Sequence, residues 1–444
     1  MTSKLTVDLR YIGTLGRKQW NAAFQINQPN FLFNGLKEAF DAARAGDDDN
    51  PRLQVLENML RGINIGGGNF GPVGSTFNGV RQTAGMHLRA STGTAAGVTG
   101  NIQSNLANGN YANLAAILNL VNYSNAFNPS LPVIPAGVNG GVLRFNGFPE
   151  NFIVTNPQFS NVYMIASVNH NNYHSMEAQI TLRPARGISM QSTYTWSKNL
   201  GLFGQVGSTY TNAVDRHADY AVLGDTRIHD FRTNGTFELP VGPGKGFLRN
   251  STGALARILE NWQLGWIFNA NSGAPVSIAA QNMLYANGSA DIVGPFDRTG
   301  KVEWNGSSGS YFMSGAVTQV RDPQCANVTT AQNLRNLCTL NAVADAKTNQ
   351  VLLQNPLPGT RGSIGLRTLE GPGIWRFDAN ISKAVKITET KTVQFRLDAT
   401  DVLNHPEPAT PILDINNPNF GLITGVGAKS NLHRQFQAQL RLNF

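Results

Sequence analysis

Apolar and polar side chains alternate with a period of two in eight segments of the chain. In the last of them an apolar residue fills every second position and polar residues lie between: Phe436, Ala438, Leu440, Leu442 and Phe444. Because successive side chains of a β-strand point to opposite faces, each segment predicts a strand with one apolar and one polar face. The eight segments are residues 5–11, 176–182, 188–196, 231–239, 262–268, 375–381, 393–399 and 436–444.

The connections between these strands alternate between long and short. They measure about 160 residues, a tight turn, then about 28, 19, 100, 5 and 30 residues, against a usual hairpin loop of two to five. Long and short connections therefore lie on opposite edges of the sheet. Short turns on one side and long loops on the other are typical of outer-membrane barrels and argue against a soluble β-sandwich.

We therefore predict an all-β fold: part of an antiparallel transmembrane β-barrel of about eight strands, with long extracellular loops at about residues 14–172 and 271–373. Helical periodicity appears inside the longer loop. Residues 36–43 fit one helical face, Asn50 and Pro51 open a second helix, and residues 114–121 predict a third. Between the last two we expect the Asn- and Gly-rich residues 93–110 to be mobile.

Aromatic residues fall near the ends of the predicted strands. Tyr11, Trp196 and Trp375 are at the ends that meet the long loops, whereas Trp262 and Phe444 are at the opposite edge. This placement predicts two aromatic girdles at the membrane interfaces. The alternative is that aromatic residues simply favour strands.

Composition excludes several classes of protein. Only 14% of the residues are charged, and no stretch approaches the roughly eighteen apolar residues of a membrane helix. The net charge of +8 comes from scattered Lys and Arg residues, so we expect no nucleic-acid partner. No secretory signal follows Met1. We therefore expect residues 1–444 to be the C-terminal part of one barrel domain, without plug or N-terminal domains.

Two cysteines lie in a polar part of the second long loop. Cys325 and Cys338 are too few for a disulfide framework, and their spacing is unlike that of zinc motifs. In an oxidising compartment a single disulfide between them is expected, and two free thiols are the alternative.

The residues that could act in catalysis or bind a metal do not form a complete motif. The glycines of residues 66–71 match a dinucleotide-binding spacing but lead into a loop, and His170 and His174 lie where we expect a turn entering a strand. The acids and histidines of residues 215–219 and 229–230 lack any nucleophile or zinc motif. We predict no enzymatic activity, no cofactor and no metal site.

Six segments of the chain are familiar when taken together: residues 5–16, 172–182, 187–200, 261–275, 374–383 and 395–406. They resemble the C-terminal barrel of TonB-dependent outer-membrane receptors, specifically the Oar-like group with a carboxypeptidase-regulatory-like domain. Residues 194–198 (YTWSK) and the terminal Phe444 are the most specific features. Such barrels have about twenty-two strands, and we count eight here.

The resemblance implies a localisation and a set of partners. It places the chain in the Gram-negative outer membrane, in contact with lipid, with surface loops that capture an unknown extracellular ligand. A plug, pulled by the TonB energy-coupling complex, would then admit the ligand. The strand that ends at Phe444, with Phe436, Leu440 and Leu442 on one face, looks like the signal read by the barrel-assembly machinery.

The function that we expect is therefore ligand capture and uptake across the outer membrane. The alternative is a surface adhesion or structural protein that uses the same loops without energised transport.

Overall fold

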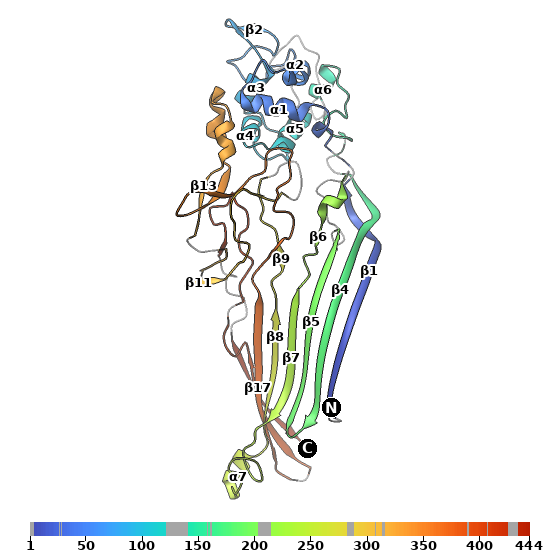
Figure 1. The fold of residues 1–444 in the computed structure, drawn as a ribbon, viewed down its shortest axis with the longest axis vertical. Helices are drawn as coiled ribbons and strands as arrows, with labels where there is room; N and C mark the ends of the chain where they lie inside the picture. Colours follow the sequence, from blue (N-terminus) through green and yellow to red (C-terminus); the bar gives the residue numbers. More distant parts are fainter. Residues whose placement is uncertain are drawn as a thin grey trace.

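The computed structural model describes residues 4–25, 27, 29–120, 141–157, 159, 162–202, 215–281, 288–306, 308–312, 316–388, 390–405, 407–424 and 434–444. Within these ranges, long antiparallel strands form one tall curved sheet. The long connections fold into further structure beyond one end of it (Figure 1). Both ends of the chain lie near the opposite end of the sheet.

Each of the eight predicted segments lies in its own strand of this sheet. Neighbours along the sheet are also neighbours among the eight in sequence, and all pair antiparallel, which confirms the predicted architecture. One short strand, β6 (Tyr220–Val222), pairs with the far end of β5. The eight are β1 (Leu5–Gln25), β4 (Tyr163–Ala185), β5 (Ile188–Leu202), β7 (His229–Glu238), β8 (Trp262–Asn271), β17 (Ile374–Lys386), β18 (Thr392–Thr400) and β20 (Gln435–Asn443).

The strand register separates the two faces of the sheet. One row of directly opposed residues is apolar: Leu9, Ala178, Tyr194, Phe231, Ala270 and Trp375. The next row, one residue along each strand, is polar: Asp8, Gln179, Thr193, Arg232, Asn269 and Arg376. The apolar face stays uncovered, with Leu9 71% and Leu440 76% exposed. We call these the apolar face and the polar face.

The first two strands are longer than predicted. β1 continues to Gln25 and β4 begins at Tyr163, so the long connection is shorter at both ends than residues 14–172. His170 and His174 accordingly lie inside β4, and the predicted turn at this position is wrong. In this part Asn21 and Asn169 are buried polar residues, so the apolar alternation on which the prediction relied stops before the strands end. The second long connection does run from Asn271 to Ile374.

The three helices predicted in the first long connection are present, although Val121 lies outside the described residues. The Asn50 side chain accepts a hydrogen bond from the backbone N–H of Arg52, with Pro51 between them, as a helix start requires. The helices are α1 (Leu36–Ala45), α2 (Gln54–Leu60) and α5 (Tyr111–Leu120).

Three further helices, each of five to seven residues, were not predicted because they are too short to show a helical period. α4 (Ile102–Ala107) lies in the stretch that we expected to be mobile, yet Ile102 and Leu106 are fully buried. The expectation of mobility is therefore wrong at this helix. The other two are α3 (Ala84–Ala90) and α6 (Gly141–Phe145).

At one end of the sheet, the long connections fold around two hydrophobic cores. We call the structure formed by these two cores the cap. The first core joins α1–α6 to residues 325–340 of the second long connection, and we call this part the helical body. Cys325 and Cys338 are joined there by a disulfide, with Cα atoms 5.7 Å apart. The second core combines residues 276–280, 290–304, 311–312, 343–369 and 413–423. In the described part of the chain, no helix has the length and apolar character needed to cross a membrane.

Candidate functional site

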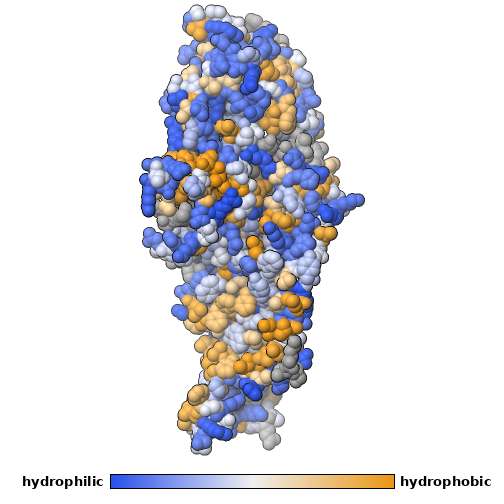
Figure 2. Space-filling model, in the orientation of Figure 1, coloured by the Kyte–Doolittle hydropathy of each residue, from blue (hydrophilic) through white to orange (hydrophobic). Residues whose placement is uncertain are grey.

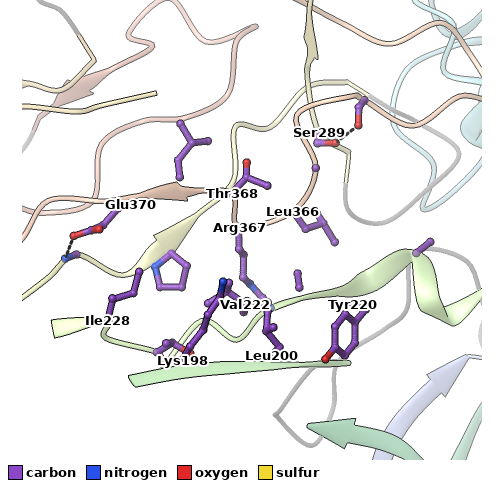
Figure 3. Close-up of a pocket in the computed structure, with 18 of the residues that line it drawn as sticks. Lys198, Leu200, Tyr220, Val222, Ile228, Ser289, Leu366, Arg367, Thr368 and Glu370 are labelled. Atoms are coloured by element: carbon purple, nitrogen blue, oxygen red, sulfur yellow. Dashed lines mark hydrogen bonds between the residues drawn. The ribbon is translucent and has the colours of Figure 1, made fainter. Parts of the chain in front are cut away.

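A cavity of about 770 Å³ lies where the sheet meets the cap. One wall is the far end of β5 with β6, and the other is the segment 361–370 (Figure 3). Residues 200 and 222 are opposed in the β5–β6 register, which places Leu200 beside Val222. Together with Ile228 and Leu366 they give the cavity an apolar lining. We call it the rim cavity.

Three cationic side chains also line the rim cavity. Lys198 is exposed, whereas Arg361 donates across 3.4 Å to the carboxylate of Asp219, which is 1% exposed. Arg367 reaches from the segment 361–370 toward the strands and donates to the carbonyl oxygen of Val222 at 3.3 Å. The carboxylate of Asp219 is therefore engaged with the protein itself.

Arg367 has an unusual backbone and a partly desolvated side chain. Its φ of 53° is in the left-handed region, which a residue without glycine's freedom rarely adopts. Burial lowers the pKa of its guanidinium, and the carboxylates of Asp219 and Asp225 oppose that shift. An arginine remains protonated under these conditions, so the cavity keeps a partly buried positive charge.

Glu370 is the acidic residue that lines the rim cavity, and it forms hydrogen bonds with other residues of the cap. The Glu370 side chain accepts a hydrogen bond from the backbone N–H of Gly273 at 2.9 Å. Tyr311 donates through its hydroxyl to the Glu370 carbonyl oxygen at 2.7 Å, and burial raises the pKa of Tyr311 to about 12. With Asp219 and Glu370 bound to the protein, the chemistry open to a ligand is apolar contact and positive charge.

A second cavity, of about 720 Å³, lies on the polar face of the sheet. Its lining comes from β4, β5, β7 and β8 and includes Glu177, Thr195, Asp230 and Arg232. Thr226 lines both this cavity and the rim cavity. Thr226 lies at the border of both cavities, which open on opposite sides of the sheet. Ser197 and Asn199 line the polar-face cavity, whereas Lys198 and Leu200, each one residue further along β5, line the rim cavity.

Charges on the polar face occur as pairs within single strands. Because residues two apart in a strand share a face, an Arg and an Asp at this spacing can contact each other. The resulting pairs keep the polar face close to neutral along its length. They are Arg232 with Asp230 at 2.7 Å, Arg376 with Asp378 at 2.9 Å, and Arg396 with Asp398 at 2.7 Å.

The aromatic residues chosen from the sequence lie on the apolar face. Tyr11 and Trp196 are both opposite Met176 and are 67% and 55% exposed. They lie inside β1 and β5, not at strand ends as predicted, because both strands continue past the apolar segment. Trp375 is the second residue of β17, and Trp262 is the first of β8 at the opposite end of the sheet. The two girdles remain a prediction.

The residues weighed as a catalytic group are engaged separately. Asp219 is paired with Arg361, Asp230 is paired with Arg232, and the ring nitrogen Nδ1 of His229 lies 2.7 Å from the Tyr194 hydroxyl. His217 instead lies beside the ring of His170, with centroids 6.2 Å apart. Among the described residues, no three His, Cys, Asp or Glu side chains are grouped to hold a metal ion.

Sequence reasoning missed the rim cavity. Lys198, Tyr220, Arg361 and Arg367 come from three segments that only the fold brings together. Of the four, Lys198 lies in a stretch singled out from the sequence, residues 194–198, but for its family resemblance and not as a binding site. The closest signal in the sequence is the pair of arginines in residues 361–367 (RGSIGLR), whose glycines permit a tight path.

A family model described as outer membrane beta barrel domain matches residues 1–437. No curated protein and no solved structure matches the chain. The match covers almost the whole sequence, and the sheet with its one apolar and one polar face agrees with it. The chain belongs to the outer membrane beta barrel domain family and is an outer-membrane protein.

Proposed function

We propose that the chain is part of an outer-membrane receptor that captures a ligand in its cap and admits it along the polar face of the barrel. The observation that carries this proposal is the presence of two cavities near the cap end of the sheet: the rim cavity, which lies against the cap, and the cavity on the polar face, with Thr226 at their border. A solute that reaches the polar face from the cap would meet paired charges there and not lipid.

The lining of the rim cavity suggests the class of ligand. Leu200, Val222 and Leu366 provide apolar contact, and Lys198 and Arg367 provide positive charge beside it. This combination fits a solute with an apolar body and a carboxylate or phosphate group, because charge-assisted hydrogen bonds to such groups are strong.

We further propose that uptake depends on TonB. The support is the resemblance of six segments to TonB-dependent receptors of the Oar-like group. In that family the energy-coupling complex acts through a plug region inside the barrel.

The second candidate function is adhesion at the cell surface without energised transport. The observation that favours it is the helical body, which has its own core and a disulfide and lies beyond the end of the sheet (Figure 1). A rigid body of this kind could hold a polymer or another cell without passing anything inward.

Uptake by cells that express the full gene separates the two functions. Cells would be given labelled medium-chain fatty acids and acidic peptides, with Lys198→Gln and Arg367→Gln as test variants and Arg52→Gln, an exposed residue of the cap, as matched control. We expect each test variant to reduce accumulation about tenfold, since a hydrogen bond to a charged group contributes roughly 1.5–3 kcal/mol.

Accumulation should also stop when a protonophore removes the proton gradient. Accumulation that is equal in parent and test variants for every probe would contradict the uptake proposal. Binding that survives the protonophore, with no accumulation in any strain, would favour adhesion.

A further inference from the structure

The β7–β8 connection, residues 239–261, projects from the end of the sheet opposite the cap (Figure 1). It contains α7 (Gly253–Leu259), a helix with no buried residue. Leu255 and Ile258 share one side of this helix and are 52% and 61% exposed, and Phe247 and Leu248 before it are 66% and 57% exposed. We infer that this connection is a membrane anchor that lies among the phospholipid headgroups at the rim of the barrel.

Hydrogen bonds place the end of α7 on the membrane-facing side of the rim. Trp262 donates through its indole N–H to the Ile258 carbonyl oxygen at 2.8 Å, and Lys383 donates to the same oxygen at 2.9 Å. Trp262 and Lys383 are opposite each other in the β8–β17 register and belong to the apolar face. The helix is therefore held beside the apolar face and not beneath the polar one.

The charges of the connection suit a phosphate-rich surface. Lys245, Arg249 and Arg257 are exposed, and Glu260 is its single carboxylate. Arg257 forms a 3.0 Å pair with Glu260, and Lys245 forms a 3.3 Å pair with Glu238 of β7, so Arg249 is the cation outside these two pairs. Hydrophobic atoms gather among hydrophilic ones at this tip of the molecule (Figure 2). A short helix with an apolar side and basic flanks is the pattern of segments that lie in the plane of a membrane interface. The partner is thus the phospholipid that surrounds the barrel, continuous with the lipid on its apolar face.

Spin labels can measure the depth of α7 in the full protein, reconstituted in vesicles of phosphatidylethanolamine and phosphatidylglycerol. Leu255→Cys and Arg257→Cys would carry labels on nearly opposite sides of the helix, about 160° apart at 3.6 residues per turn. Both native cysteines are in the disulfide and do not take the label. Leu357→Cys, an exposed position in the cap, serves as the aqueous control.

We expect the ratio of collisions with oxygen to collisions with a water-soluble nickel complex to be several-fold higher at position 255 than at 357, with 257 between them. Equal ratios at 255 and 357 would overturn the inference. A label at 255 that neither oxygen nor nickel reaches would also overturn it, because it would show burial against protein. In the Arg249→Gln variant, the ratio at 255 should decrease.

Discussion

Gly235 of β7 and Trp266 of β8 are directly opposite each other on the apolar face, and the indole of Trp266 fills the space where a side chain at 235 would be. A methyl group added at Gly235 would overlap this indole and the carbonyl oxygen of Ser189. The glycine therefore lets a large aromatic side chain pack flat against its neighbouring strand, on a surface that faces lipid.

Gly235→Ala should destabilise the barrel, because forcing extra volume into a packed contact costs about 1–3 kcal/mol. The measurement is the urea midpoint of the protein in lipid vesicles, followed by the gel mobility of unheated samples. Gly246→Ala is the matched control, since its added methyl group would be 3.6 Å from the nearest atom. An equal midpoint for both variants would show that the Trp266 indole moves aside at no cost.

Two neighbouring carboxylates of the cap should differ sharply in their effect on its stability. Asp48 accepts a hydrogen bond from Arg89 at 2.6 Å, and Arg89 is 1% exposed, whereas Asp49 forms a 3.6 Å pair with an exposed Arg81. Removing one partner of a buried pair costs about 3–5 kcal/mol, and an exposed pair contributes about 0–1 kcal/mol. Asp48→Ala should therefore lower the free energy of unfolding of the helical body far more than Asp49→Ala.

Urea unfolding followed by circular dichroism at 222 nm reports on the helical body, because α1–α6 account for most of the described helix. Similar midpoints for the two aspartate variants would refute the importance of the buried pair. Arg89 also donates to the carbonyl oxygen of Ala43 and to the Gln332 side chain, so Arg89→Met should lower the midpoint as well.

The stability of the helical body should fall as the pH decreases from about 6.5 to about 4. Burial lowers the pKa of His87 from 6.5 to about 4, and its Nδ1 accepts hydrogen bonds from the backbone N–H groups of Ile65 and Gly66. Between these two pH values the unfolded chain binds a proton that the folded one does not, so protonation favours unfolding.

The free energy of unfolding of the helical body should decrease by about 3 kcal/mol across this pH window, since each unit of pKa shift corresponds to roughly 1.4 kcal/mol. Urea midpoints measured by circular dichroism at several pH values would test it. His87→Gln keeps a hydrogen-bond acceptor but does not titrate, so its stability should depend less on pH in this window. The difference in pH dependence between the parent protein and His87→Gln gives the contribution of His87 alone. It excludes the contribution of Glu57, whose pKa is raised by burial and which both proteins contain. Parallel curves would rule out His87 as the cause.

The last strand should determine how much of the protein reaches the outer membrane. Phe444 is 86% exposed, and Phe436, Leu440 and Leu442 lie on the same face of β20 and are also exposed. If the barrel-assembly machinery reads this apolar end, Phe444→Ser should reduce the folded protein in outer-membrane fractions several-fold. Asn443→Ser, on the opposite face, should leave the amount unchanged. An undiminished amount of the Phe444 variant would argue against the signal.

How far the sequence predicted the structure depended on local contrast between neighbouring residues. In β20, where Phe436 to Phe444 alternate with polar residues, the strand, its faces and its neighbour could all be expected. The upper parts of β1 and β4 were not predicted, because polar residues such as Asn21 and Asn169 are buried there and interrupt the apolar alternation. Short helices such as α4 were not predicted either. Its six residues make less than two turns, which is too few to show a helical period.

The sequence by itself determined the eight strands, their two faces and the order in which they pair, because a period of two and short turns are local properties. Only the tertiary structure decided which distant segments meet. Cys325 and Leu334 complete the core of helices α1–α6, which lie at residues 36–145 of the chain, and Arg367 reaches Val222 at the rim cavity. Such contacts depend on the path by which the long connections fold back toward the sheet. This path cannot be predicted from the residues that are neighbours in sequence.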